Sequence, residues 1–113
     1  YKDFTFEAAH KLPLVPDTHK CSKLHGHSFQ VRVTVEGHLN NLGWVVDYAE
    51  IKSICGPIID KLDHSYLNEL SGLTNPTSEN IAVWLWDAIK PKLMMLSEIE
   101  VKETCNTGCI YRG

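Results

Sequence analysis

Residues 25–36, HGHSFQVRVTVE, alternate strictly between two kinds of side chain. After Gly26, every even position is polar. The odd positions carry two histidines followed by apolar side chains: His25, His27, Phe29, Val31, Val33 and Val35. Successive side chains of a β-strand point to opposite faces, so this pattern predicts a strand with one buried and one solvent-facing side. The same period of two recurs in residues 4–12, where the apolar side holds Phe4, Phe6, Ala8, His10 and Leu12.

Two more strands are expected after this pair. The segment WVVDY, residues 44–48, predicts a short third strand, and SEIEVKET, residues 97–104, predicts a fourth. In the fourth strand Ile99, Val101 and Glu103 share one side.

Apolar side chains at helical spacing predict two helices between the third and fourth strands. Asp47, with Glu50 three residues later, caps the first, and Gly56-Pro57 is expected to kink or interrupt it. Asn75 or Thr77 caps the second, which is expected within residues 75–91. We therefore expect one α+β domain over residues 1–113, with two helices on one face of an antiparallel four-stranded sheet.

The composition of the chain argues against nucleic acids and membranes as partners. The net charge of −3 argues against general binding of nucleic acid, and no apolar run is long enough to span a membrane. Four cysteines without an apolar signal core at the start lead us to expect free thiols and a cytoplasmic protein. One basic patch, formed by Lys11, Lys20 and Lys23 with only Asp17 against them, is a candidate site for an anionic ligand.

Three histidines fall on the apolar sides of the first two strands: His10, His25 and His27. A lone histidine on such a face is more often a satisfied core residue than a ligand. An H-x-H pair whose two side chains point the same way, with a third histidine on a neighbouring strand, favours a metal site. Neutral imidazoles suit Zn²⁺, and three protein ligands leave the open position that is typical of catalytic zinc.

Three further residues carry chemistry. Glu103 occupies a core-facing position, where a carboxylate needs a partner such as the paired N–H donors of a guanidine-like heterocycle edge. The alternative is a strand that frays before Glu103. Asp63 and His64 form a carboxylate–imidazole pair, which by itself is common on surfaces. Cys21, an idle thiol in most settings, becomes a candidate base in a basic loop beside a metal.

The motifs EAAHKL, CSKLHGH, LDH, NPTSEN and VKET fall in one order along the chain. In that order the chain resembles the 6-pyruvoyltetrahydropterin synthase superfamily. The three residues between Cys21 and the HGH motif, and the ending VKETCNTGCIYRG, are similar to the bacterial 6-carboxytetrahydropterin synthases of queuosine biosynthesis. The resemblance implies a tunnelling fold, in which sheets of several subunits join into a barrel, and a homohexamer of two stacked trimers.

The resemblance also implies roles for individual residues. The zinc ligands would be His10, His25 and His27. Cys21 would be the general base, with Asp63 and His64 moving protons beside it. Glu103 would grip the 2-amino-4-oxo edge of a pterin, near Thr77, Ser78 and Thr104. The implied reaction converts 7,8-dihydroneopterin triphosphate to 6-carboxy-5,6,7,8-tetrahydropterin, acetaldehyde and triphosphate.

Three alternatives stay open at this point. The same fold and site can run pyruvoyl synthase chemistry, which removes triphosphate without breaking the carbon chain. A non-catalytic, zinc-stabilised oligomer that binds pterins is a second alternative. A zinc hydrolase built on the three histidines is a third, but it normally needs a carboxylate base close to the metal, and none adjoins these histidines in sequence.

Overall fold

The two alternating segments form the centre of the sheet. In the computed structural model, which describes residues 1–113, β1 (Lys2–His10) and β2 (His25–Val35) pair antiparallel from Lys2 opposite Val33 to His10 opposite His25. Their inward side chains alternate as expected, and Phe6, Phe29, Val31 and Val33 are fully buried. The predicted period of two is therefore confirmed in both strands, although β1 begins and ends two residues earlier than residues 4–12.

The sheet has five strands rather than the four expected, in the order β3-β1-β2-β4-β5. β4 (Leu96–Thr104) pairs antiparallel with β2, and β5 (Thr107–Tyr111) folds back on β4. β3 (Ser65–Tyr66) adds a short parallel pairing to β1, so the sheet is mixed and the expectation of a purely antiparallel sheet is wrong. Both extra strands were missed because they are short and lack an alternating apolar pattern.

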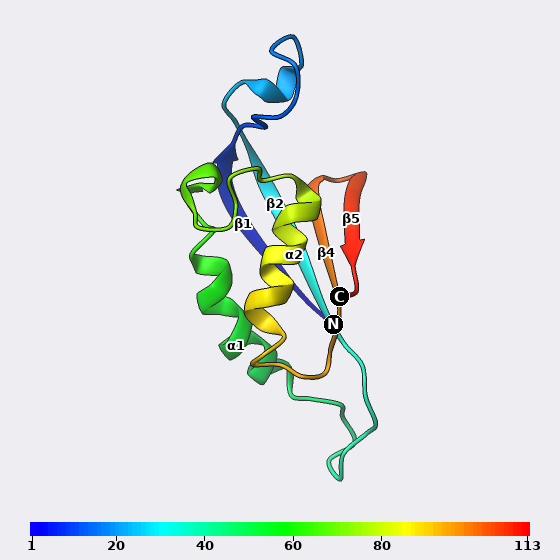
Figure 1. The fold of residues 1–113 in the computed structure, drawn as a ribbon. Coiled ribbons are helices and arrows are strands. Elements are labelled where there is room, and N and C mark those ends of the chain that lie inside the picture. The colour runs from blue at the N-terminus through cyan, green and yellow to red at the C-terminus, as the bar shows by residue number, and fades with distance from the viewer.

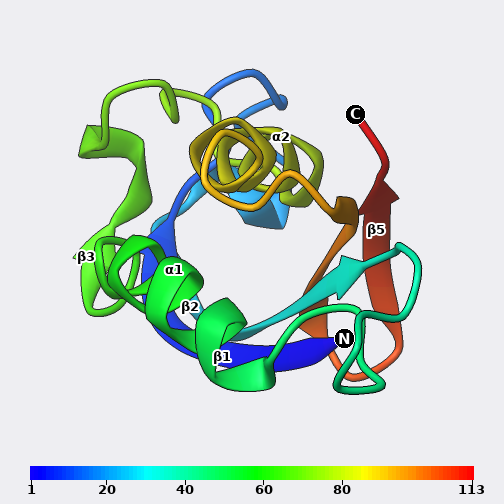
Figure 2. The ribbon, with the colours of Figure 1, turned by 90° about the horizontal axis from the view of Figure 1, so that it is seen from below.

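Two helices cover the concave face of the curled sheet (Figure 1, Figure 2). α1 (Tyr48–Asp60) begins at Asp47, whose side chain accepts a hydrogen bond from the Ala49 amide; α2 (Ser78–Ile89) begins at Thr77, which accepts one from the Asn80 amide. Asp47 and Thr77 are therefore confirmed as capping residues, and Thr77 rather than Asn75 caps α2. One cluster of 20 buried hydrophobic residues fills the space between helices and sheet. The α+β prediction with helices on one face is confirmed.

The structure differs from two local predictions. α1 is not interrupted at Gly56-Pro57, because Cys55 before the proline and Ile58 and Ile59 after it are all buried, and this packing outweighs one lost backbone hydrogen bond. The segment 44–48 forms no strand. The Asn40 amide donates to the Trp44 carbonyl, and the Trp44 amide donates to the Asn40 side chain, so the backbone closes a loop instead of joining the sheet.

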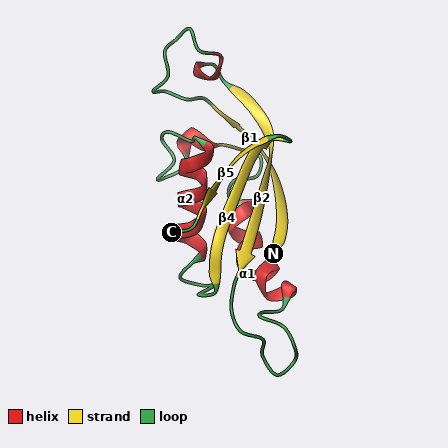
Figure 3. Cartoon of the chain, turned by 90° about the vertical axis from the view of Figure 1, so that its right-hand side faces the viewer, coloured by secondary structure: helices red, strands yellow, loops and turns green.

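Two long loops extend the molecule at opposite ends, giving it dimensions of 56 × 23 × 22 Å (Figure 3). Residues 11–24, which include a short 3-10 helix at Lys20–Ser22, lie beyond the end of the sheet where β1 stops and β2 starts. Residues 36–47 lie beyond the other end. A second short 3-10 helix spans Leu67–Glu69. Neither α1 nor α2 has the length and apolarity needed to cross a membrane.

Candidate metal centre and active site

The pairing of β1 with β2 brings the three predicted histidines together at one end of the sheet. His10 lies directly opposite His25, and His27 lies opposite Ala8, so all three side chains leave the same face. The ring centroids of His10 are 4.5 Å from His25 and 5.2 Å from His27. One ligand nitrogen from each residue lies within 4.8 Å of the other two.

Backbone carbonyls fix how two of these rings are oriented. The Nδ1 of His10 is 2.8 Å from the carbonyl oxygen of Pro76, and the Nδ1 of His25 is 2.7 Å from that of Lys23. A carbonyl oxygen only accepts hydrogen bonds, so each Nδ1 carries the proton and each Nε2 presents a lone pair. Such outer contacts orient metal-binding histidines and set their tautomer.

Two of the ring nitrogens at the cluster have no hydrogen-bond partner within the protein. The Nε2 atoms of His10 and His27 are both buried and form no hydrogen bond. Burial lowers the pKa of both imidazoles below the usual range. This effect of burial outweighs the Glu103 carboxylate, which acts to raise the same pKa values. Two neutral, buried and unpaired Nε2 atoms that converge with a third imidazole fit Zn²⁺, which binds neutral imidazole nitrogen.

Glu103 lies at this same cluster. The β2–β4 register ends with Gln30 opposite Lys102, so Glu103 points to the face that carries Val101 and Ile99. One carboxylate oxygen is 3.9 Å from the Nε2 of His10, and the other is 3.6 Å from the Nε2 of His27. β4 continues to Thr104, and the predicted inward position of Glu103 is therefore present without fraying.

Cys21 lies in the 3-10 helix of the loop beyond the histidine end of the sheet. The loop is closed at its base, because the Leu12 amide donates to the Cys21 carbonyl at 2.8 Å. The Cys21 amide donates to the Nδ1 of His19, the residue before the helix. Cys21 is half-buried and is one of four free cysteines. Among the others, burial raises the pKa of the Cys55 thiol to about 11, which makes that residue an inert part of the core.

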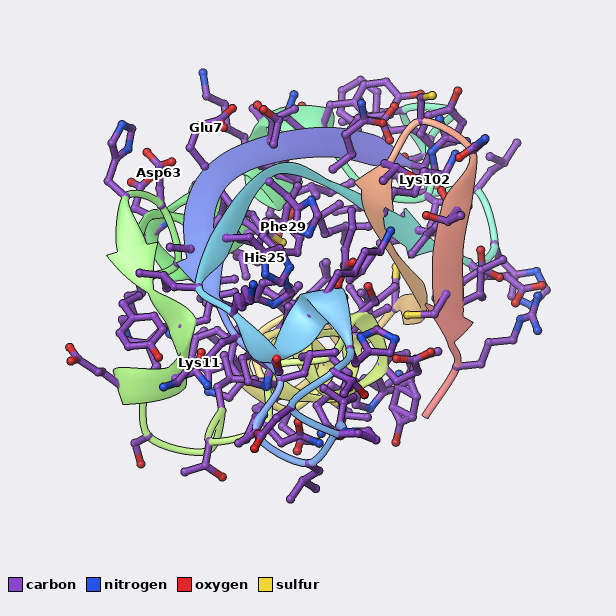
Figure 4. The ribbon with its side chains drawn as sticks, turned by 90° about the horizontal axis from the view of Figure 1, so that it is seen from above. Glu7, Lys11, His25, Phe29, Asp63 and Lys102 are labelled. Carbon is purple, nitrogen blue, oxygen red and sulfur yellow. The ribbon has the colours of Figure 1, made fainter.

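The Asp63–His64 pair lies on the other side of β1 from the histidine cluster. Figure 4 shows Glu7 and Asp63 outside the curl of the sheet, and His25 and Phe29 inside it. One Asp63 oxygen accepts from the Glu7 amide at 2.8 Å, and the other is 2.9 Å from the Nδ1 of His64. These contacts, the Glu7 amide first, lower the pKa of the Asp63 carboxyl. The structure forms the predicted dyad but does not bring it against the three histidines within one chain.

The dyad lies at a constrained backbone position. His64 is the only non-glycine residue with a positive φ, +56°, and its amide donates to the Glu7 carbonyl. A left-handed backbone conformation at a residue other than glycine is uncommon and marks a constrained position. The His64 ring is 79% exposed and borders a depression together with Glu7, Gly26 and Ser28.

The remaining predicted residues follow Pro76 and Glu103 in the chain, two residues that contact the cluster. Thr77 and Ser78 directly follow Pro76, whose carbonyl binds His10, and they begin α2. Thr104 follows Glu103 at the turn into β5, where its hydroxyl contacts the hydroxyl of Thr107. Each of these positions is therefore linked to the cluster through a neighbouring residue of the chain, Pro76 or Glu103.

The three lysines all lie on the loop and its bases. The Lys20 ammonium is near enough to His27 to act against protonation of that imidazole. The backbone of Lys11 is held by Asn68, whose side-chain oxygen accepts from the Lys11 amide and whose amide group donates to the Lys11 carbonyl. Asn68 and Pro76 were missed in the sequence, because a tethering amide or carbonyl has no distinctive residue pattern.

Comparison with known proteins gives consistent results. A family model described as 6-pyruvoyl tetrahydropterin synthase matches residues 1–113. To the 6-carboxy-5,6,7,8-tetrahydropterin synthase of Synechocystis sp., the chain is 41% identical over 118 residues. The alignment covers 98% of this chain and 90% of that protein. It is 36% identical over 89 residues to the dihydroneopterin monophosphate aldolase of Pyrococcus furiosus, over 79% of this chain and 72% of that one.

Among solved structures, the 6-pyruvoyl tetrahydropterin synthase of Caenorhabditis elegans superposes with a TM-score of 0.88 at 27% sequence identity. The superposition covers 99% of this chain and 92% of that one.

Proposed function

Because the chain belongs to the 6-pyruvoyl tetrahydropterin synthase family, we propose that it is a zinc-dependent pterin lyase. It converts 7,8-dihydroneopterin triphosphate and water to 6-carboxy-5,6,7,8-tetrahydropterin, acetaldehyde and triphosphate. This reaction belongs to queuosine biosynthesis. The relative from Synechocystis, which carries the name of this activity and matches nearly the whole chain, supports the choice within the family.

The observation that carries the proposal is the pair of buried, unpaired Nε2 atoms of His10 and His27, converging with His25. A stable fold that leaves a buried polar nitrogen without a hydrogen-bond partner loses about 1–3 kcal/mol for each such atom. A bound cation recovers this loss. When bound, zinc supplies Lewis acidity toward the hydroxyl groups of the pterin side chain, which makes the neighbouring carbon more acidic.

The chain's own residues then handle the protons and the substrate. Cys21, in the loop at the histidine end, is the general base that removes a proton from the side chain of the substrate. Glu103 accepts hydrogen bonds from the 2-amino group and ring N–H of the pterin, with Thr77, Ser78 and Thr104 beside it. Lys11, Lys20 and Lys23 attract the triphosphate.

The position of the dyad supports an oligomeric site. Asp63 lies outside the curl of the sheet whereas His25 lies inside it (Figure 4), so the dyad of one chain is turned away from its own histidines. In the homohexamer that we propose for this cytoplasmic enzyme, the Asp63–His64 pair that returns a proton to the substrate therefore comes from a neighbouring subunit. The unpaired outer edge of β5 leaves the sheet free to continue into another chain.

The decisive experiment is to incubate the zinc-loaded protein with dihydroneopterin triphosphate and to assay acetaldehyde and the pterin product together. Acetaldehyde with a carboxylated tetrahydropterin is the expected result. A pyruvoyl product would assign the sister activity. Binding of pterin without turnover would indicate a non-catalytic, zinc-stabilised oligomer.

A second substrate belongs in the same assay, because the relative from Pyrococcus furiosus is named a dihydroneopterin monophosphate aldolase. Faster turnover of the monophosphate than of the triphosphate would assign aldolase chemistry to this chain. The lysines of the loop favour the triphosphate, which carries more negative charge.

A further inference from the structure

The loop that carries Cys21 has no buried interior of its own. It joins His10, the last residue of β1, to His25, the first residue of β2, and none of residues 11–24 is buried. Apolar packing within the chain therefore does not fix the position of the thiol. That position depends on hydrogen bonds, and those at Cys21 come from two directions.

The backbone of Cys21 is held on both sides. Its carbonyl oxygen accepts from the Leu12 amide at 2.8 Å, which ties Cys21 to the chain just after β1 ends. Its amide donates to the Nδ1 of His19 at 3.0 Å. Holding both groups restricts the two backbone dihedral angles of Cys21, and therefore the direction in which its thiol projects.

His19 occupies the N-cap position of the 3-10 helix Lys20–Ser22. An N-cap residue supplies a side-chain acceptor for an amide two or three residues later, and serine, threonine, aspartate and asparagine are the usual choices. Here a neutral imidazole does so, which places the lone pair on Nδ1 and the proton on Nε2. The rings of His10 and His25 adopt the opposite tautomer, because their Nδ1 atoms donate to carbonyl oxygens. His19 therefore serves the loop as a hydrogen-bond acceptor, a use that the cluster histidines do not share.

The loop also holds His19 itself. Its amide donates to the Pro16 carbonyl at 2.8 Å, and its carbonyl accepts from the Ser22 amide at 3.0 Å. The Ser22 hydroxyl donates to the Asp17 carbonyl at 3.0 Å, which closes the same turn. The imidazole is therefore a fixed support for the Cys21 amide.

We propose that His19 is a positioning residue: by accepting a hydrogen bond from the Cys21 amide, it sets where the thiol lies beyond the histidine end of the sheet. This inference rests on the function proposed above, in which Cys21 is the general base. A general base works only within hydrogen-bond reach of the proton that it removes, and a displacement of about 1 Å can lower a rate about 100-fold. His19 forms no hydrogen bond with the three cluster histidines, so its effect should fall on kcat and not on zinc content.

The test measures turnover of dihydroneopterin triphosphate by the zinc-loaded protein and its variants. His19→Ala removes the acceptor and should lower kcat about 10- to 100-fold, with KM changed by less than about threefold. His19→Asn places an amide oxygen at the N-cap, where it can accept from the Cys21 amide, and should keep kcat within about threefold of the wild-type value. Thr18→Ala, at the exposed residue next to His19, is the matched control and should turn over as the wild type does.

A double-mutant cycle shows whether His19 acts through the thiol. In a Cys21→Ala background no base is left to position, so adding His19→Ala should change the residual kcat by less than about twofold.

Hydrogen exchange of the Cys21 amide is a readout that needs no turnover. In His19→Ala this amide should exchange about 2- to 10-fold faster than in the wild type, the factor that one exposed hydrogen bond supplies. In His19→Asn it should exchange at nearly the wild-type rate, because the acceptor is restored.

Wild-type kcat in His19→Ala, or an equal loss in His19→Ala and His19→Asn, would overturn the proposal. A change confined to KM would also overturn it, because His19 would then hold the substrate and not the base. An undiminished effect of His19→Ala in the Cys21→Ala background would show that His19 acts independently of the thiol and would refute positioning. Unchanged turnover in Cys21→Ala alone would instead contradict the proposed base, and the exchange rates would then decide whether His19 holds the Cys21 amide.

Discussion

Zinc should stabilise this protein strongly, and the substitution His10→Phe should abolish that stabilisation. The metal-free fold buries the Nε2 atoms of His10 and His27 without a partner, at a cost of about 1–3 kcal/mol each. Binding recovers this cost, and at a free zinc concentration 1,000 times the dissociation constant the gain in stability is about 4 kcal/mol.

The gain converts to a shift in melting temperature. A chain of 113 residues has an unfolding entropy of about 0.24 kcal/mol per kelvin, so 4 kcal/mol corresponds to roughly 17 °C. In His10→Phe the new ring fills the space beside Phe29 but cannot bind metal. The substitution removes the unpaired Nε2, which is stabilising, and leaves the Pro76 carbonyl unpaired, which is destabilising. The unfolding free energy of the metal-free variant should therefore stay within about 2 kcal/mol of the wild-type value.

The assay is differential scanning calorimetry at a fixed protein concentration, with zinc or with a chelator. Circular dichroism of the metal-free variant shows whether it is folded. His38→Phe is the matched control, since His38 lies exposed in the loop at the far end of the molecule and should leave the zinc shift intact. A zinc shift below a few degrees in the wild type, or an undiminished shift in a folded His10→Phe, would refute the coordination by His10.

Three further predictions follow from the site. Cys21→Ala should lower kcat by at least about 100-fold while zinc content and pterin binding persist, as isothermal titration can check; unchanged turnover would remove Cys21 as the base. Asp63→Asn should alter the pH–rate profile. It should also make the free energy of unfolding depend less steeply on pH below about pH 4, because a carboxyl with a lowered pKa contributes stability that is lost as pH falls through that pKa. Thr77→Ala should cost about 1 kcal/mol of unfolding free energy through loss of the α2 cap, whereas Thr74→Ala should not.

The histidine cluster could be predicted because a period of two fixes the face of each side chain. What the sequence does not contain is the register that sets His10 opposite His25, since pairing between distant segments depends on the whole sheet. Nor does it reveal the carbonyls of Pro76 and Lys23, because every residue has one. The dyad was recognised, but its position outside the curl depends on the turn at His64.

Errors in the fold have equally specific causes. Val45 and Val46 have the composition of a strand, but the Asn40–Trp44 hydrogen bond closes the backbone before a partner strand is reached. β5 forms because only Cys105 and Asn106 separate it from β4, so chain geometry replaces the missing apolar pattern. The continuity of α1 at Pro57 reflects burial on both sides of the proline. In each case long-range packing or closure outweighed local preference.

The stack of rings beneath the cluster has a consequence for how this protein can change. Phe29 lies 5.5 Å from the ring of His10 and 5.4 Å from that of His27, and it stacks on Phe6 at 4.8 Å. His10, which would hold the metal, is therefore also a side chain of the interior, and His27 lies at its border. Selection for thermostability at Phe6 or Phe29 would alter metal selectivity as a by-product, and directed evolution of metal preference would have to be screened together with solubility.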